Sequence, residues 1–254
     1  MRLRISPSAL GSYKHCQLHF KLSYIDKLKP VMRGTIYSVL GVAVHDSIDH
    51  FFKQFKELRT NDLPTLLKIF EETFAKRCQE QLPELPEVTF ASFVETGKKM
   101  LTSYHKYDFE EGNVNFVLDS EKKFVVDCGD FDLVGIVDRS YKHGEVISVT
   151  DYKTGAVRSQ KDVDSDDQLS LYSWMYWHSN GVIPDSLCLY FLKPDKRVYT
   201  TRTQEQLHAF YNKIVEFKDK VMAQTVFEPN FKGCAMCDFK FNCPESEKKK
   251  IRLT

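Results

Sequence analysis

Two aspartates and a lysine lie close together between residues 138 and 153, in an order that suits the hydrolysis of phosphodiester bonds. Asp138 ends the segment FDLVGIVD, and Asp151 and Lys153 lie at the end of the segment EVISVTDYK. Carboxylate oxygens are the ligands that hard cations such as Mg²⁺ prefer. Such a cation stabilises the attacking and leaving oxygens, while a lysine orients or activates the attacking water. We therefore interpret these three residues as a candidate catalytic set.

Two predicted β-strands and the turn between them position this set. Apolar residues alternate in both segments, which indicates strands, and the intervening KHGE is typical of a turn. Side chains two residues apart share a face of a strand, so Asp151 and Lys153 point to the same side. If the hairpin turns about the histidine and glycine of KHGE, Asp138 pairs with Val149 and has Asp151 as its diagonal neighbour at about 7 Å. One cation could then bridge both carboxylates; the alternative is a surface hairpin with an ordinary Asp–Lys pair.

Periodicity and capping signals predict the other elements of the fold. Ser6 and Pro7 are typical of a helix start, and Thr203 with Gln206 forms a capping box for a long helix near the C-terminus. A helical period predicts further helices over residues 41–58, 63–82, 88–107 and 168–177. A period of two predicts a three-stranded meander over residues 115–153 and two more strands, at 186–193 and 197–202. This order of helices and strands predicts an α/β fold.

Composition limits the class of protein. The 254 residues are 42% hydrophobic, which is enough for a substantial core in one large domain. The net charge is +1, so binding to nucleic acid would have to use local basic patches. No apolar run approaches the roughly 18 residues of a membrane-spanning helix, so we expect no membrane partner. The start of the sequence lacks the apolar centre of a signal peptide, and the seven cysteines are odd in number and unevenly spread, so we expect a cytoplasmic protein.

Three polar residues on predicted helices are further candidates. His45 lies beside the apolar stripe of the helix at 41–58, where a histidine is more often a hydrogen-bonded boundary residue than a metal ligand. Gln168 and Tyr172 stand one helical turn apart on the helix at 168–177. The alternative for this pair is a partly buried amphipathic face without a chemical role. The residues alone leave both readings open.

Three cysteines near the C-terminus form a second candidate site. Cys234, Cys237 and Cys243 stand in the pattern C-x2-C-x5-C, a spacing that is usual for metal binding in an intracellular protein. A fourth ligand is missing from this stretch, and Cys16, in YKHCQLHF, is the best candidate for it, although Cys128 in a predicted turn is harder to exclude. Four thiolates suit zinc or an iron–sulfur cluster, and the proline after the last cysteine favours the cluster. Such a centre would join residue 16 to residue 234 and stabilise the fold.

Several short motifs, taken together and in order, resemble the RecB-like branch of the PD-(D/E)XK nuclease superfamily. They are ISPSALGSYKHC, GVAVH, GIVDR, DYKTG, QLSLY and the cysteine trio, and they cover nearly the whole chain. Within this branch the chain is similar to the iron–sulfur nucleases, which include CRISPR-associated exonucleases and the AddB nuclease domain. The signature proline is not adjacent to the first aspartate, and GIVDR stands in its place.

The resemblance implies a role for each matching residue. It makes His45, Asp138 and Asp151 ligands of Mg²⁺ or Mn²⁺ and Lys153 the catalytic lysine. Gln168 and Tyr172 become active-site residues that contact the substrate or its water. The [4Fe–4S] cluster ligands are Cys16, Cys234, Cys237 and Cys243.

We therefore expect an α/β, restriction-endonuclease-like fold, with a mixed central sheet flanked by helices and a C-terminal iron–sulfur staple. Residues 1–254 would form one nuclease domain, with a helical subdomain at about 41–112, a catalytic sheet core at 115–202 and the staple at 16 and 234–243. The expected function is metal-dependent cleavage of DNA, as an exonuclease on single strands or ends, in repair, recombination or CRISPR adaptation, with a protein partner in such a complex. One alternative is a catalytically inactive nucleic-acid-binding subunit of a larger nuclease complex, and another is a zinc-stapled regulatory protein.

Overall fold

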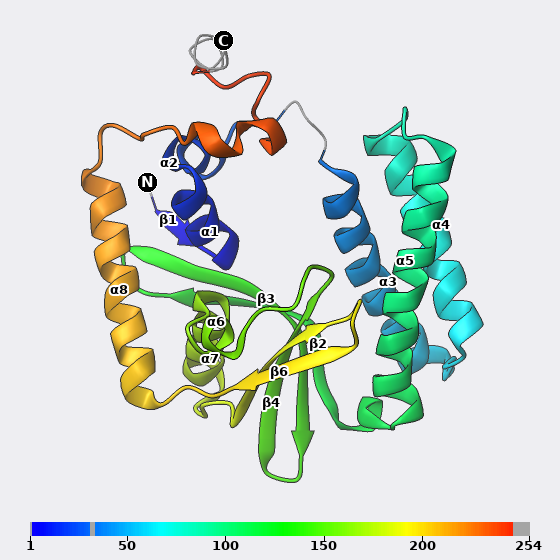
Figure 1. Cartoon of the computed structure of the whole chain (residues 1–254). Coiled ribbons are helices and arrows are strands. Elements are labelled where there is room, and N and C mark those ends of the chain that lie inside the picture. Colours follow the sequence, from blue (N-terminus) through cyan, green and yellow to red (C-terminus); the bar gives the residue numbers. More distant parts are fainter. Residues whose placement is uncertain (1, 31–33, 246–254) are drawn as a thin grey trace.

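A mixed β-sheet lies at the centre of the computed structural model, which describes residues 2–30 and 34–245 (Figure 1). Within this part of the chain six strands form the sheet in the order β1-β3-β4-β5-β6, and β2 pairs with the other edge of β3. β1–β3 and β4–β5 are parallel pairs and the remaining pairs are antiparallel, which confirms the predicted mixed sheet. The strands are β1 (Leu3–Ile5), β2 (Val117–Asp127), β3 (Phe131–His143), β4 (Val146–Lys153), β5 (Ser186–Phe191) and β6 (Lys196–Thr200).

Helices cover both faces of this sheet (Figure 1). The α-helices are α1 (Pro7–His15), α2 (Gln17–Phe20), α3 (Ile36–Leu58), α4 (Leu63–Gln81), α5 (Glu87–His105), α6 (Gln160–Asp164), α7 (Asp167–Asn180) and α8 (Gln204–Ala223). Short π and 3-10 turns are η1 (Lys21–Ile25), η2 (Lys106–Glu110), η3 (Asn113–Phe116) and η4 (Phe231–Met236). The mixed sheet flanked by helices confirms the α/β part of the predicted fold class.

Side-chain capping fixes where most of the described α-helices begin. Ser6 accepts a hydrogen bond from the backbone of Ala9 at the start of α1, and Thr203 forms the predicted capping box of α8. The predicted start of α3 at residue 41 was wrong by five residues. A second capping box, formed by Thr35 and Ser38, begins this helix earlier.

Two apolar cores hold the layers together. On one face of the sheet α1, α7 and α8 pack against β3 and β5, through side chains such as Leu171 and Phe210. On the other face α3, α4 and α5 pack together and against β4 and β5, where Phe70 and Tyr104 share a core with Tyr152 and Tyr190. The helices at 36–105 are therefore joined to the sheet by a continuous core, which fixes α3 beside the middle of β3 and the C-terminal end of β4.

The register of the β3–β4 hairpin differs from the predicted one. Val149 pairs with Ser140, and the predicted pairing of Asp138 with Val149 is wrong. The turn consists of residues 144 and 145, one residue later than expected, because Gly144 adopts the positive φ of 62° that such tight hairpin turns require. Continued by one residue beyond the last pair, Arg139 with Thr150, this register places Asp138 directly across from Asp151.

Candidate active site

The predicted catalytic residues gather where β3 and β4 diverge. Their pairing ends at Arg139 and Thr150, and the backbone N–H of Tyr152 donates instead to Asp138 Oδ2 at 2.7 Å. A cleft of about 710 Å³ opens beside this point. All six predicted catalytic and divalent-metal residues line it, namely His45, Asp138, Asp151, Lys153, Gln168 and Tyr172. The structure therefore brings together side chains from α3, β3, β4 and α7.

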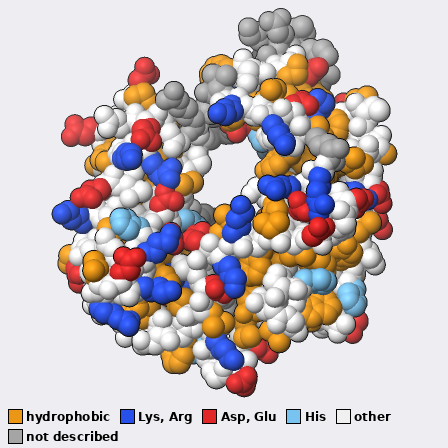
Figure 2. Space-filling model, turned by 180° about the vertical axis from the view of Figure 1, so that it is seen from behind, with side chains coloured by type: hydrophobic (Ala, Val, Ile, Leu, Met, Phe, Trp, Pro, Cys, Tyr) orange, Lys and Arg blue, Asp and Glu red, His pale blue; other side chains and the backbone are white. Residues whose placement is uncertain are grey.

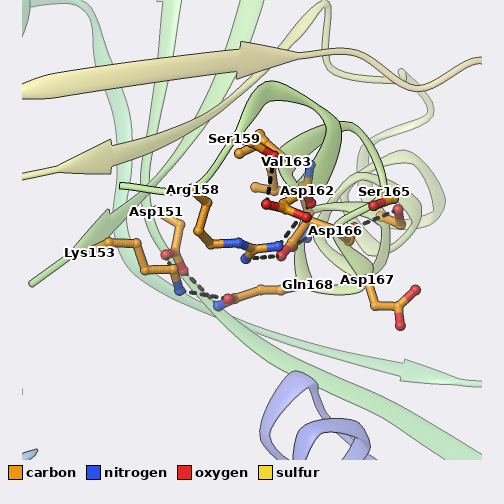
Figure 3. A network of polar contacts seen from close by, with 12 residues as sticks. Asp151, Lys153, Arg158, Ser159, Asp162, Val163, Ser165, Asp166, Asp167 and Gln168 are labelled. Atoms are coloured by element: carbon orange, nitrogen blue, oxygen red, sulfur yellow. Dashed lines mark hydrogen bonds and ion pairs between the residues drawn. The ribbon is translucent and has the colours of Figure 1, made fainter. Parts of the chain in front are cut away.

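A chain of hydrogen bonds joins four of these residues (Figure 3 shows three of them). Lys153 Nζ lies 2.6 Å from Asp151 Oδ2 and donates to Gln168 Oε1 at 2.7 Å. The amide nitrogen of Gln168 donates to Asp151 Oδ1 at 2.7 Å and to the hydroxyl of Tyr172 at 2.8 Å. Gln168 thus holds the lysine and the carboxylate in a fixed relation to each other.

The start of α7 is fixed by its own polar contacts, which position Gln168. Asp166 caps the helix by accepting from the backbone of Leu169 at 2.8 Å, and Arg158 donates to its other oxygen at 2.6 Å (Figure 3). Further along, α7 approaches β3 so closely that a Cβ on Gly135 would lie 2.5 Å from the methyl group of Met175. The absence of a side chain at Gly135 lets Tyr172 reach the cleft.

His45 faces two carboxylates across the cleft. Its Nδ1 lies 3.5 Å from Asp138 Oδ1 and 3.9 Å from Glu121 Oε1, and its Nε2 lies 3.1 Å from the carbonyl oxygen of Tyr152. Burial alone lowers the pKa of His45, but the charges and hydrogen bonds of these carboxylates outweigh it and raise the pKa well above its usual value. A histidine nitrogen and carboxylate oxygens are a donor set that fits Mg²⁺ or Mn²⁺, and a bound cation would replace the proton on His45.

Asp151 is the most buried carboxylate of the cleft, with 3% of its surface exposed. Burial and, after it, the negative charge of Asp138 raise the pKa of Asp151 to about 6. A buried carboxylate that faces a second one is stabilised in its charged form by a nearby cation. The site therefore has an electrostatic reason to bind a divalent metal ion.

We expect Asp151→Asn to raise the thermal stability of the metal-free protein at pH 8. The rise of the pKa of Asp151 from 3.8 to about 6 corresponds to about 3 kcal/mol of unfavourable free energy when the group is charged. This cost is present above pH 6 and disappears as the pH falls towards 4, because the folded protein then takes up the proton. Calorimetric melting of both proteins across this range should show that the difference between their melting temperatures shrinks as the pH falls. A difference that is independent of pH would contradict the raised pKa of Asp151.

Glu121 is a residue of the cleft that the sequence analysis missed. The ligand atoms of His45, Glu121 and Asp138 all lie within 4.8 Å of one another. Asp151 does not belong to this group among the residues that the structure describes. A glutamate inside a strand looks like a solvent-facing residue in the sequence pattern, so only the β2–β3 register could have indicated it.

A buried polar cluster lies behind the cleft and holds the β4 backbone. Arg139 is fully buried, donates to the hydroxyls of Tyr104 at 2.8 Å and Tyr152 at 3.3 Å, and stacks 4.1 Å from the ring centre of Phe52. Its charge is balanced by buried Asp108, 3.6 Å away. Since the backbone of Tyr152 contacts both Asp138 and His45, this cluster fixes the position of the cleft residues.

The four predicted cluster cysteines line a second, separate cavity, together with apolar side chains such as Leu18 and Phe239. Cys16 is the N-cap of α2, and its sulfur accepts from the backbone of Asn230 at 3.3 Å. Burial raises the pKa of Cys237 and of Cys243, and the nearby thiols of Cys16 and Cys234 act in the same direction. Cys128 lies elsewhere, in the β2–β3 turn. The structure therefore brings residue 16 and the C-terminal trio together.

Comparisons with known proteins agree with this fold. The central sheet with carboxylates and a lysine at diverging strands is a nuclease-like architecture, and a family model described as the PD-(D/E)XK nuclease superfamily matches residues 4–244. The chain belongs to this superfamily. No curated protein matches it.

A solved structure with a similar fold has low sequence identity to this chain. A "Putative exonuclease" from Eubacterium rectale is 9% identical, with a TM-score of 0.57 over 94% of this chain and 88% of its own. A protein described as SSO0001 is 15% identical over 66% of this chain and 79% of its own, but its TM-score of 0.34 is too low to support an argument. None of the helices in the described part of the chain is both long and apolar enough to cross a membrane.

Proposed function

We propose that the protein is a metal-dependent deoxyribonuclease that acts as an exonuclease on single-stranded DNA or on DNA ends. The observation that carries the proposal is the convergence of Asp138, Asp151 and Lys153 on one cleft, in a chain of a nuclease superfamily. An inactive nucleic-acid-binding subunit would have no need to keep these three groups together around a buried carboxylate.

In the proposed mechanism His45, Asp138 and Asp151 hold Mg²⁺ or Mn²⁺. The bound cation supplies Lewis-acid stabilisation of the attacking and leaving oxygens. Lys153 lies at the rim of the cleft, where its Nζ can donate a hydrogen bond to the attacking water. Gln168 keeps Lys153 beside Asp151, and the hydroxyl of Tyr172 extends the same hydrogen-bonded chain.

The shape of the molecule supports a preference for single strands or ends. Figure 2 shows an opening in the molecule, with Lys and Arg side chains at its rim. The carboxylate of Asp151 lines the cleft and is almost completely buried. A flexible single strand or a frayed end can bring a phosphate to that depth more easily than a rigid duplex. Because the net charge is only +1, we also propose that a protein partner in a repair, recombination or CRISPR complex helps to hold the DNA.

Cleavage of defined substrates tests the proposed activity. The protein should degrade a linear, labelled single strand in the presence of Mn²⁺ or Mg²⁺, act more slowly on a blunt duplex, and leave a circular single strand intact. Cleavage of the circular strand at the same rate as the linear strand would refute the exonuclease assignment, but it would still agree with a nuclease. No metal-dependent cleavage of any substrate would refute the nuclease itself.

Gln168→Ala and Tyr172→Phe are expected to lower kcat by about 10- to 1000-fold without loss of metal binding, because neither side chain is proposed as a ligand. Single-turnover cleavage and calorimetric titration with Mn²⁺ measure the two effects separately. Gln160→Ala is the matched control, since Gln160 bonds to Asp164 and to the backbone of Tyr199. If both variants cleave DNA at the wild-type rate, Gln168 and Tyr172 have no role in catalysis and are ordinary packing residues.

We also propose that Cys16, Cys234, Cys237 and Cys243 hold a [4Fe–4S] cluster. All four cysteines line one cavity together with apolar side chains, which supports a single centre held by the four thiolates. A proline directly follows Cys243, which favours the cluster over a single zinc ion.

A further inference from the structure

Glu121 lies in a row of three carboxylates that crosses the sheet. In the β2–β3 register Ser120 pairs with Arg139 and Lys122 with Val137, so Glu121 lies directly across from Asp138. On the other side, the β3–β4 register places Asp151 across from the same aspartate. Asp138 therefore stands between two acidic neighbours, one on each adjacent strand.

The backbone of Glu121 adopts a conformation that a strand residue with a side chain rarely takes. Its φ is +48°, in the left-handed region. A regular strand position would continue the pairing with β3, but Glu121 is unpaired in the β2–β3 ladder between its two paired neighbours, Ser120 and Lys122. The conformation turns its carboxylate towards His45, whose Nδ1 is 3.9 Å from Glu121 Oε1.

The contacts of the cleft oxygens show which groups face His45. One oxygen of Asp151 accepts from Gln168 and the other lies 2.6 Å from Lys153 Nζ, so Asp151 would share these oxygens with a bound cation. One oxygen of Asp138 accepts from the backbone of Tyr152, and the other faces His45. Glu121 supplies the second carboxylate whose oxygen lies within 4.8 Å of a ligand atom of His45 and of a ligand atom of Asp138.

We propose that Glu121 is a ligand of the divalent cation held by His45 and Asp138. The inference rests on the proposed metal-dependent nuclease function and adds a residue from β2 to its ligand set. One nitrogen and two carboxylate oxygens converge there, a donor set that suits Mn²⁺ and Mg²⁺. The left-handed backbone of β2 at Glu121 then has a function, because it directs a fourth ligand into the cleft beside the three already proposed.

Calorimetric titration of the full-length protein with Mn²⁺ tests this proposal. Glu121→Gln should raise the Kd for Mn²⁺ at least tenfold, and the loss of cleavage should be partly recovered by excess metal. Glu121→Gly should lose Mn²⁺ affinity equally while its Tm equals or exceeds that of the wild type, since glycine adopts the left-handed conformation without strain. This pair of results separates a ligand from a residue that merely supports the fold.

Asp119→Asn is the matched control, because it removes one negative charge from the same strand at a residue paired with Lys122 and Ser140. Its Mn²⁺ affinity should stay at the wild-type value. Equal losses of Mn²⁺ affinity in Glu121→Gln and Asp119→Asn would indicate that the negative charge of the strand, and not a ligand role of Glu121, sets the affinity. This result would overturn the assignment. If the wild-type protein binds Mn²⁺ and cleaves DNA and Glu121→Gln binds Mn²⁺ with the same affinity, Glu121 is not a ligand. The proposed nuclease function would then still hold. Wild-type protein that binds no Mn²⁺ would overturn both.

Discussion

Asp138→Asn is expected to lower the rate of metal-dependent DNA cleavage by at least about 10³-fold, which corresponds to about 4 kcal/mol of transition-state stabilisation. Asp138 lies centrally between Glu121 and Asp151, and it also faces His45. The asparagine oxygen can still accept from the backbone of Tyr152, so the fold should survive while the charge that holds the cation is lost. Steady-state cleavage of a labelled oligonucleotide and Mn²⁺ titration measure the two losses.

The control for this variant is Asp130→Asn, which removes the same charge from an exposed turn residue paired with Lys218. It should cleave at the wild-type rate. A variant Asp138→Asn that melts at the wild-type temperature and turns over within tenfold of the wild type would contradict the role of this cleft as the catalytic site.

Cys16→Ser is expected to remove the metal centre and a large part of the stability together. Protein purified without oxygen should be brown and hold about four irons per chain, and the variant should hold none. A centre that joins residue 16 to residue 234 constrains most of the chain, which on the disulfide model stabilises the fold by about 5 kcal/mol. Iron and sulfide analysis, with thermal melting of both proteins, measures the effect.

Cys128→Ser is the control, because Cys128 lies outside the cavity that the other four cysteines line. It should keep both iron and stability. Colourless wild-type protein with one tightly bound zinc ion would refute the iron–sulfur cluster. The proposal that a metal centre joins Cys16 to the three C-terminal cysteines would still hold. Full iron content in Cys16→Ser would show that another residue is the fourth ligand.

Local patterns predicted most of the described helices and every described strand except β1, because periodicity and caps depend on residues that are adjacent in the sequence. The meander that carries Asp138, Asp151 and Lys153 follows from alternation, and the start of α8 follows from Thr203 and Gln206. Their convergence with His45 was implied by motifs and not by periodicity. The structure places them around one cleft.

Features set by single backbone conformations were not predictable in the same way. The hairpin register depended on whether the turn used residue 143 or residue 144 as its first position, and a shift of one residue moved Asp151 from a diagonal to a direct neighbour of Asp138. Glu121 reaches the cleft through a left-handed φ that no alternation rule indicates. Both features depend on how the strands pair, and a single sequence gives only indirect information about strand pairing.

The most direct test of the proposed activity is cleavage of an end-labelled single strand by wild-type protein and Lys153→Ala, purified side by side and assayed with Mn²⁺. Lysine is no metal ligand when charged, so the variant should bind Mn²⁺ as the wild type does. The wild type should shorten the strand from an end, and the variant should lose this activity by at least about 10²-fold. Equal cleavage by both proteins, or wild-type protein that binds Mn²⁺ and leaves every DNA substrate intact, would contradict the assignment of this cleft as a nuclease active site.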